Sequence, residues 1–188
     1  DIHAGGEDLI FPHHENEIAQ SEAANGKEFS RYWMHNGFLN IDNRKMSKSL
    51  GNFRTVREIS EKYDLQVLRF FMLSAHYRSP LNFSAELMEA AKSGLERIIT
   101  AAERLKFLMG SAKTEDMAET EAEKFAKSAE YVGNFESAMD DDFNTADAIA
   151  AVFDLVKFIN TMTDEDSSKE YLENLFDRLV RLTEVLGI

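Results

Sequence analysis

The sequence predicts a mainly α-helical protein whose second half is an antiparallel, up-and-down helical bundle. From residue 84 onward, apolar residues recur at helical spacing, with hardly a strand signal between them. The charged residues are also distributed unevenly between the two halves of the chain. Residues 1–84 hold 10 Lys and Arg against 11 Asp and Glu, whereas residues 85–188 hold 11 against 23. The halves therefore differ in composition, and the acidic residues of the second half fit the solvated faces of bundle helices.

Length and composition exclude several classes of protein. With 188 residues, of which 44% are hydrophobic, the chain can bury a core and is not a disordered tail. No apolar run approaches the ~20 residues that cross a bilayer, and the first eight residues do not resemble a signal peptide. We therefore expect a cytoplasmic protein that does not associate with membranes. Because the chain begins at Asp1 without a Met, we also expect it to be a piece of a longer protein.

Net charge and cysteine content restrict the chemistry further. A net charge of −13 disfavours non-specific adhesion to nucleic acid, so any such contact must be local. The chain has no cysteine, which excludes disulfides, thiol nucleophiles and Cys-ligated zinc within these residues alone.

Local signals place the expected elements. Pro12 suits the first turn of a helix that Asn25-Gly26 ends, and Thr55 with Glu58 forms a capping-box signature. Asp64 can cap the next helix. The expected elements are a helix over 12–24, a strand over 32–41 followed by a loop to 52, short helices near 55–63 and 64–75, and bundle helices over 84–110, 122–132, 144–159 and 172–186.

A glycine pair near the start of the chain could approach a ligand. Gly5 and Gly6 have no side chains to keep a ligand from the backbone, and the nearby Asp8 could accept hydrogen bonds from ribose hydroxyls. From spacing alone, a tight turn at the end of a strand is the preferred explanation of the same glycines.

A histidine and a glutamate at the start of the first helix could share a metal ion. His13 and Glu17 are four residues apart and therefore lie within ~40° of one another around a helix, whereas His14 points roughly 100° away from His13. A ring nitrogen with a carboxylate oxygen suits zinc. Two ligands do not complete a tetrahedral site, so from this chain alone a His–Glu hydrogen bond on the helix surface is the preferred interpretation.

A basic loop carries the most specific string. Lys45 and Lys48 stand three residues apart in Lys45-Met46-Ser47-Lys48-Ser49, among small and hydroxylic side chains and before Gly51. Two ammonium groups on a loop with a glycine hinge suit a clamp on a polyphosphate. For the lysine pair alone, a solvated basic loop is the alternative.

The string 45–49 resembles the signature loop of the class I aminoacyl-tRNA synthetases. Its neighbours resemble the cysteinyl-tRNA synthetases within that class, in the same order along essentially the whole chain; they are residues 1–9, 11–17, 34–37, 76–79 and 139–145. The resemblance implies the C-terminal part of an α/β, Rossmann-like catalytic domain over 1–53. It further implies a stem-contact region over 54–83 and a tRNA-binding helical bundle of DALR type over 84–188.

The resemblance also implies an activity and its partners. This family converts cysteine and ATP, with Mg²⁺, into cysteinyl-adenylate and pyrophosphate, and then transfers the cysteinyl group to its tRNA. A monomeric parent is expected. Gly5, Gly6 and Asp8 stand where the family binds the adenosine and ribose. Lys48, with Lys45, stands where the family stabilises the pyrophosphate leaving group, which makes these lysines the expected catalytic residues.

The zinc site of the family is implied as well. His13 and Glu17 stand at two of four Zn²⁺ ligands, the others being upstream cysteines, and His3 and His14 stand in a histidine group beneath the amino-acid pocket. Because both cysteines and the family's N-terminal ATP-binding motif are absent from the sequence, we expect the isolated chain to be inactive and to bind zinc weakly.

Contacts with tRNA are expected from cations in the nearly neutral half, namely Arg54, Arg57, Arg69 and Arg78. Two alternative functions remain open. One is a ligase of the same superfamily that joins cysteine to an amino sugar, against which the Asn16-Glu17 pair argues because it supplies the synthetase carboxylate. The other is a non-catalytic fragment that binds RNA or protein.

Overall fold

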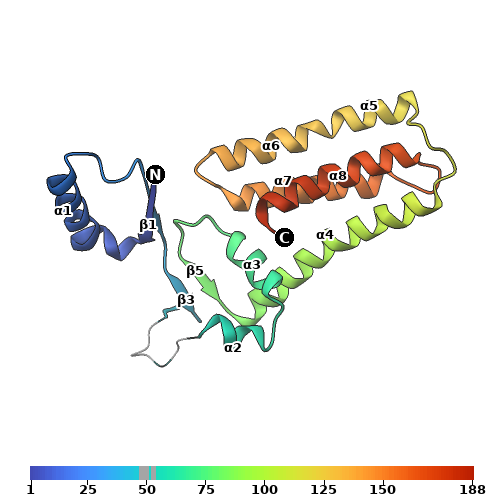
Figure 1. Cartoon of the computed structure of the whole chain (residues 1–188). Helices are drawn as coiled ribbons and strands as arrows, with labels where there is room; N and C mark the ends of the chain where they lie inside the picture. Colours follow the sequence, from blue (N-terminus) through green and yellow to red (C-terminus); the bar gives the residue numbers. More distant parts are fainter. Residues whose placement is uncertain (47–50, 52–53) are drawn as a thin grey trace. The chain divides into compact units, whose positions relative to one another are not determined.

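The computed structural model of the chain describes residues 1–46, 51 and 54–188 (Figure 1). These residues form two compact units, one from residues 1–59 with 77–84 and the other from residues 60–76 with 85–188. Helices predominate, and the strands form small sheets, which confirms the predicted fold class. Within the described ranges, each helix is too short or too polar to cross a lipid bilayer.

A parallel strand pair organises the first unit. β1 (Ile2–Gly6) pairs in parallel with β2 (Tyr32–Asn36), in register from Ile2 opposite Tyr32 to Gly6 opposite Asn36. Parallel neighbours need a crossover, and residues 7–31 supply it. From the sequence, a strand that ends at the glycines is one explanation of the glycine pair, and the structure confirms that strand.

The crossover consists mainly of helical turns. It contains a 3₁₀ turn, η1 (Glu7–Leu9), a π turn, η2 (Ile10–His14), and the helix α1 (Glu15–Asn25). Gly26 follows with φ 61°, a left-handed conformation that glycine adopts without steric cost. The predicted helix and its C-terminal stop are confirmed, whereas its first turn is wider than the regular α-helix we expected.

The predicted strand over 32–41 is wrong as one element, because it is divided at Gly37. β2 ends at Asn36, and β3 (Leu39–Ile41) belongs to another sheet, between β4 (Arg44–Lys45) and β5 (Leu81–Phe83). β3 and β4 are antiparallel, and β3 and β5 are parallel. The backbone of residues 77–81 causes the division, since the Gly37 amide donates to Tyr77 O at 2.8 Å and the Leu81 amide to Phe38 O at 2.9 Å.

Two short helices follow, and their predicted caps are confirmed. Before α2 (Val56–Ser60), the Glu58 amide donates to Thr55 Oγ1 at 3.2 Å, and the Thr55 amide donates to Glu58 Oε2 at 2.8 Å. These reciprocal bonds make the capping box. Before α3 (Leu65–Leu73), Asp64 Oδ1 accepts from the Gln66 amide at 2.7 Å.

The second unit is the predicted bundle. α4 runs one way, α5 and α6 return, and α7 and α8 complete the up-and-down order (Figure 1). The helices are α4 (Ala85–Ser111), α5 (Glu119–Lys127), α6 (Ala129–Asp140), α7 (Thr145–Met162) and α8 (Lys169–Leu186). Fully buried side chains from α4, α7 and α8 form its core, and they include Met88, Leu105, Val152, Leu155, Ile159, Tyr171, Leu172 and Leu175.

The helix predicted over 122–132 is wrong as a single helix, because Ser128 separates α5 from α6. Ser128 Oγ donates to Phe125 O at 2.8 Å, and the Arg178 guanidinium donates to the same carbonyl at 2.9 Å and to Ser128 Oγ. The guanidinium also lies 3.8 Å from the centre of the Phe125 ring. Since Arg178 belongs to α8, local sequence could not predict this break.

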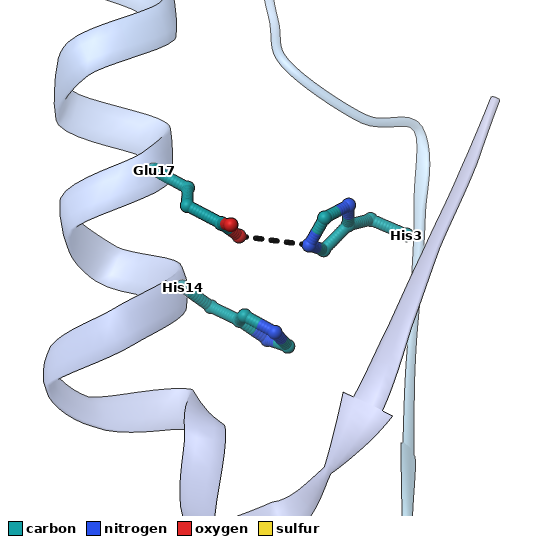
Figure 2. A group of neighbouring side chains, drawn as sticks. All are labelled: His3, His14 and Glu17. Atoms are coloured by element: carbon teal, nitrogen blue, oxygen red, sulfur yellow. Dashed lines mark ion pairs between the residues drawn. The ribbon is translucent and has the colours of Figure 1, made fainter.

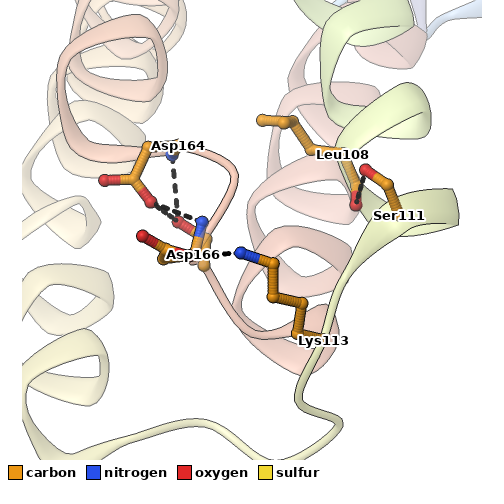
Figure 3. A network of polar contacts seen from close by, with 6 residues as sticks. Leu108, Ser111, Lys113, Asp164 and Asp166 are labelled. Atoms are coloured by element: carbon orange, nitrogen blue, oxygen red, sulfur yellow. Dashed lines mark hydrogen bonds and ion pairs between the residues drawn. The ribbon is translucent and has the colours of Figure 1, made fainter.

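A polar network closes one end of the bundle, where the linker between α4 and α5 meets the turn before α8 (Figure 3). Lys113 Nζ lies 2.7 Å from Asp166 Oδ1. The Asp166 amide donates to Asp164 Oδ1 at 3.0 Å. The first amides of α8 donate to linker carbonyls, Lys169 N to Thr114 O at 2.9 Å and Glu170 N to Glu115 O at 3.0 Å. These bonds satisfy helix-terminal donors that otherwise lack partners.

At the other end of the bundle, the loop between α6 and α7 contacts the end of α3. Asp142 Oδ2 lies 3.6 Å from His76 Nε2, and Thr145 Oγ1 donates to Ala75 O at 3.4 Å. His76 and Asp142, which belong to two of the strings that carry the resemblance, are therefore neighbours in space although they are distant in sequence. Asp142 and Phe143 have φ of 56° and 55°, which non-glycine residues rarely adopt.

Candidate functional site

The candidate site lies where β1, β2 and the start of α1 meet in the first unit. His3 comes from β1, His14 ends η2, Glu17 lies in the first turn of α1, and His35 comes from β2. Figure 2 shows His3, His14 and Glu17 pointing toward one another. Gly5 and Gly6 end β1 beside them. The carboxyl ends of parallel strands are where open α/β sheets bind ligands.

The polar atoms of this group lie close together. His3 Nε2 is 2.8 Å from Glu17 Oε2, and His3, His14 and Glu17 each offer one ligand atom within 4.8 Å of the others. His14 is 5% exposed, and its Nδ1 lies 2.8 Å from His35 Nε2. In that contact one ring nitrogen donates and the other accepts, so the two imidazoles fix each other's tautomers. The arrangement could hold a cation or orient a polar ligand.

Aromatic rings hold the imidazoles in place. The His3 ring lies 4.8 Å from His14, 5.0 Å from Phe29 and 4.9 Å from Trp33, measured between ring centres. Trp33 is also nearly parallel to His35, with 11° between the planes. This packing restricts ring rotation, so the ligand-facing nitrogens are positioned before any ligand arrives.

Gly5 allows the close approach of β1 to its neighbours. A Cβ on Gly5 would lie 2.9 Å from His14 Cε1 and 2.9 Å from Leu9 Cδ1, and one on Gly6 would lie 2.5 Å from Asp8 Oδ1. The two distances from Gly5 are shorter than packed side chains tolerate, whereas the exposed Asp8 side chain can rotate away from Gly6. The structure therefore brings Gly5, Gly6 and Asp8 together with His14. Their role toward a nucleotide stays a prediction.

The structure groups Glu17 with His14, whereas helical spacing predicts that Glu17 pairs with His13 and that His14 points elsewhere. The His13 side chain is exposed and is not in the group formed with His3. On a regular helix Glu17 lies about 40° from His13 and about 60° from His14, on opposite sides, so spacing alone cannot choose between them. β1 decides the side by placing His3 next to His14. A zinc-ligand role for His13 stays a prediction.

His35 is the residue that the sequence analysis missed. It occurs in the string 34–37 quoted for the resemblance, yet nothing local marks it as part of a site. The signal is the register of the parallel pair, which sets His35 opposite Gly5 and hence beside His14. That register requires β1, which the sequence analysis did not expect as an element.

The predicted catalytic lysines are not in the described geometry. Lys48 lies outside the described residues, and for Lys45 only the backbone, in β4, is described. All four arginines predicted to contact tRNA are described, and Arg54 and Arg57 are exposed. Arg69 packs beside Gly187, the residue after α8, and Arg78 Nε lies 3.2 Å from Tyr77 Oη. Contacts of Arg54, Arg57, Arg69 and Arg78 with tRNA stay predictions.

Comparison with protein families identifies the class. Residues 1–93 match the family "tRNA synthetases class I (C) catalytic domain", and residues 134–188 match the DALR domain. The chain belongs to the class I tRNA synthetases, as the resemblance predicted.

Particular relatives bear the name cysteine–tRNA ligase. The chain is 64% identical over its full length to that protein from Lachnospira eligens and 55% identical to that from Clostridioides difficile. It is also 55% identical to that from Lachnoclostridium phytofermentans. The chain spans about 40% of the length of these relatives.

Solved structures share the fold. The match to the ternary complex of Agrobacterium radiobacter K84 agnB2 LeuRS with tRNA and LeuAMS covers all of this chain and 28% of the other chain. Its TM-score is 0.74, at 18% sequence identity. Mycobacterium tuberculosis methionyl-tRNA synthetase with methionyl-adenylate matches 99% of this chain, with 41% of its own length, at the same TM-score and 19% identity. At such identities the likeness extends to the fold alone.

Proposed function

We propose that the protein to which this chain belongs is a cysteine–tRNA ligase, which forms cysteinyl-adenylate from cysteine and ATP and then charges its tRNA. One observation carries the proposal. Residues that the resemblance assigns to nucleotide, amino acid and zinc converge at one edge of the β1–β2 pair, namely Gly5, Gly6, Asp8, His3, His14 and Glu17. The relatives' shared name supports the same activity. This activity places the protein in the cytoplasm, where we expect it to act as a monomer.

The proposed roles follow from the chemistry of each group. The bare backbone at Gly5 and Gly6 lies against the adenosine, and the exposed Asp8 carboxylate accepts hydrogen bonds from the ribose. The imidazoles of His3 and His14, packed against aromatic rings, border the amino-acid pocket. Lys48, with Lys45 and Mg²⁺, stabilises the charge that develops on the departing pyrophosphate. Residues 54–83 contact the tRNA stem, and the helical bundle over 84–188 also binds the tRNA.

Zinc is part of the proposal. The exposed His13 and Glu17, four residues apart, offer a ring nitrogen and a carboxylate oxygen, which are donors that suit Zn²⁺. Bound zinc prefers the soft sulfur of cysteine to the hydroxyl of serine, and this preference supplies specificity. We assign Glu17 and His13 as two of four ligands and two cysteines of the full-length protein as the others. Without those cysteines, the isolated chain should hold zinc weakly and should not activate cysteine.

The histidine assignment can be tested directly in the full-length protein. His13→Asn and Glu17→Gln are each expected to weaken zinc binding at least tenfold, because each removes one of four ligands. His14→Asn is the matched control, since it changes a neighbouring imidazole that contacts His35. Competition with a chromogenic zinc chelator measures the affinity. If His14→Asn lost zinc and His13→Asn kept it, His14 would replace His13 as the ligand.

Cysteine-dependent exchange of pyrophosphate into ATP tests the proposed function. The full-length protein should catalyse this exchange without tRNA and should then transfer cysteine to tRNA but not to an amino sugar. Transfer to the amino sugar instead would identify the related ligase. Tight RNA binding by the full-length protein without any exchange would identify a non-catalytic binding protein. The isolated 188-residue chain serves as the inactive control.

A further inference from the structure

A polar groove lies between α4 and α7 of the bundle, remote in sequence from the residues of the candidate site. The groove has a volume of about 440 Å³. The exposed cations Arg97 and Lys157 line it, together with the hydroxyl and amide side chains of Ser93, Thr100, Asn160 and Thr161. Buried Ala101 and Val156 form its apolar floor. The groove thus offers two positive charges and several hydrogen-bonding groups on an accessible surface.

The two cations of the groove are not neutralised by carboxylates. Among the residues that the structure describes, neither Arg97 nor Lys157 forms an ion pair. The groove's one carboxylate, Glu96, lies 4.0 Å from Lys92 Nζ. Other cations of the same unit are neutralised in this way, in the pairs Lys113–Asp166, Lys169–Glu115 and Arg181–Glu136.

The local sequence explains why Arg97 keeps its charge available. The positions three and four residues away on the same helix face hold Ser93, Gly94, Thr100 and Ala101, which are all uncharged. The guanidinium instead lies 4.7 Å from the centre of the Phe153 ring. Stacking on a ring face orients the planar guanidinium while its N–H edges stay free to donate.

The chemistry of this groove matches a phosphodiester. Phosphate oxygens in nucleic-acid complexes are bound mainly by Arg and Lys together with Ser, Thr and Asn side chains, and these are the residue types present. A base or a small apolar ligand would need an enclosed pocket, whereas the polar side chains here are exposed. Residues 85–188 carry 11 basic and 23 acidic residues, so most of the surface around the groove repels a polyanion. A polyanion would therefore contact this half mainly at the groove, which would fix its position.

We propose that the α4–α7 groove binds a backbone phosphate of the tRNA through Arg97 and Lys157. This proposal rests on the proposed function, since it takes tRNA as the polyanion, and it adds a contact in the bundle to those expected from the first 84 residues. Contacts to phosphate carry no sequence information, so the groove holds the tRNA in position and does not select it.

Salt-dependent tRNA binding by the full-length protein tests the groove. Lys157→Gln and Arg97→Gln are each expected to weaken binding about fivefold near 0.1 M salt and to reduce the slope of log K against log salt by about 0.8, because one released counterion is lost. Lys127→Gln is the matched control, since it removes the same charge from an exposed position on α5 outside the groove. Fluorescence anisotropy with labelled tRNA measures both quantities, and thermal midpoints confirm that each variant is folded.

The outcomes separate this proposal from the proposed function. Unchanged tRNA affinity and salt slope in the folded groove variants would overturn the groove proposal. An equal loss of affinity in Lys127→Gln would overturn it too, because it would indicate a general charge effect. The wild-type protein decides the proposed function by itself: if it neither activates cysteine nor binds tRNA, that function fails, and the groove proposal fails with it.

Discussion

Replacing Gly37 with alanine should unfold the first unit while the bundle stays folded. A Cβ on Gly37 would lie 2.6 Å from the Ser79 carbonyl carbon and 2.8 Å from Pro80 N. These are backbone atoms, which cannot rotate away as a side chain can. Forcing extra volume into such a contact typically costs about 1–3 kcal/mol, and the upper end is expected here because strand segments must separate to make room. A unit built from short strands and few buried side chains has little stability to lose.

The chain provides its own reporters for this result. Trp33 is the only tryptophan, and it packs in the first unit against His3, Phe29 and His35. Its fluorescence should shift to the emission of a solvent-exposed ring, whereas the helical circular dichroism of the bundle should persist. Gly110→Ala is the control, because nothing lies within 4 Å of its added Cβ. That change should stabilise α4 by up to about 1 kcal/mol. Wild-type Trp33 emission in Gly37→Ala would contradict the prediction.

Local sequence predicted the helices well because their signals lie within one or two turns. The capping groups Thr55 and Asp64 accept the backbone bonds expected of them, and Asn144 at the start of α7 accepts a similar bond. The strands were predicted poorly, since pairing joins segments far apart in the chain. β1 has two glycines among five residues, and β5 has three residues in all. The break at Ser128 depends in the same way on an arginine from α8.

The candidate site shows the same limit. The glycine pair, the histidines and Glu17 could be nominated from residue type and spacing, because they lie within 17 residues of the N-terminus. Which histidine faces Glu17 could not be predicted, since it depends on where β1 places His3. His35 needed the strand register as well. Sequence therefore supplied the chemical groups, and the fold decided which of them meet.

Replacing Glu121 with alanine should destabilise the bundle by about 3 kcal/mol. The side chain is 9% exposed and joins the start of α5 to the start of α8. Its Oε1 accepts from the Ser168 amide at 2.9 Å, and its Oε2 accepts from Ser168 Oγ at 2.6 Å and from the Ala118 amide at 3.0 Å. Truncation leaves these donors without their acceptor, and each buried donor so orphaned costs about 1–3 kcal/mol.

The same carboxylate makes stability depend on pH. Burial raises the pKa of Glu121, but the hydrogen bonds from Ser168 and Ala118 outweigh burial and hold the pKa below its ordinary value of 4.5. A depressed pKa in the folded state means that the unfolded state binds the proton first as pH falls. The contribution of Glu121 is therefore complete above pH 4.5 and is lost as pH falls through the folded pKa. The stability difference between wild type and Glu121→Gln should shrink over that range.

Asp166→Asn provides the control, because it removes a carboxylate from the same end of the bundle. Asp166 forms the ion pair with Lys113 in Figure 3, but its side chain is 83% exposed and that of Lys113 is 69% exposed. Water screens such pairs, so its removal should leave the urea midpoint at neutral pH nearly unchanged. Equal losses in Asp166→Asn and Glu121→Ala would show that the net charge at this end of the bundle matters. A loss confined to Glu121→Ala would show that its buried hydrogen bonds hold α5 to α8.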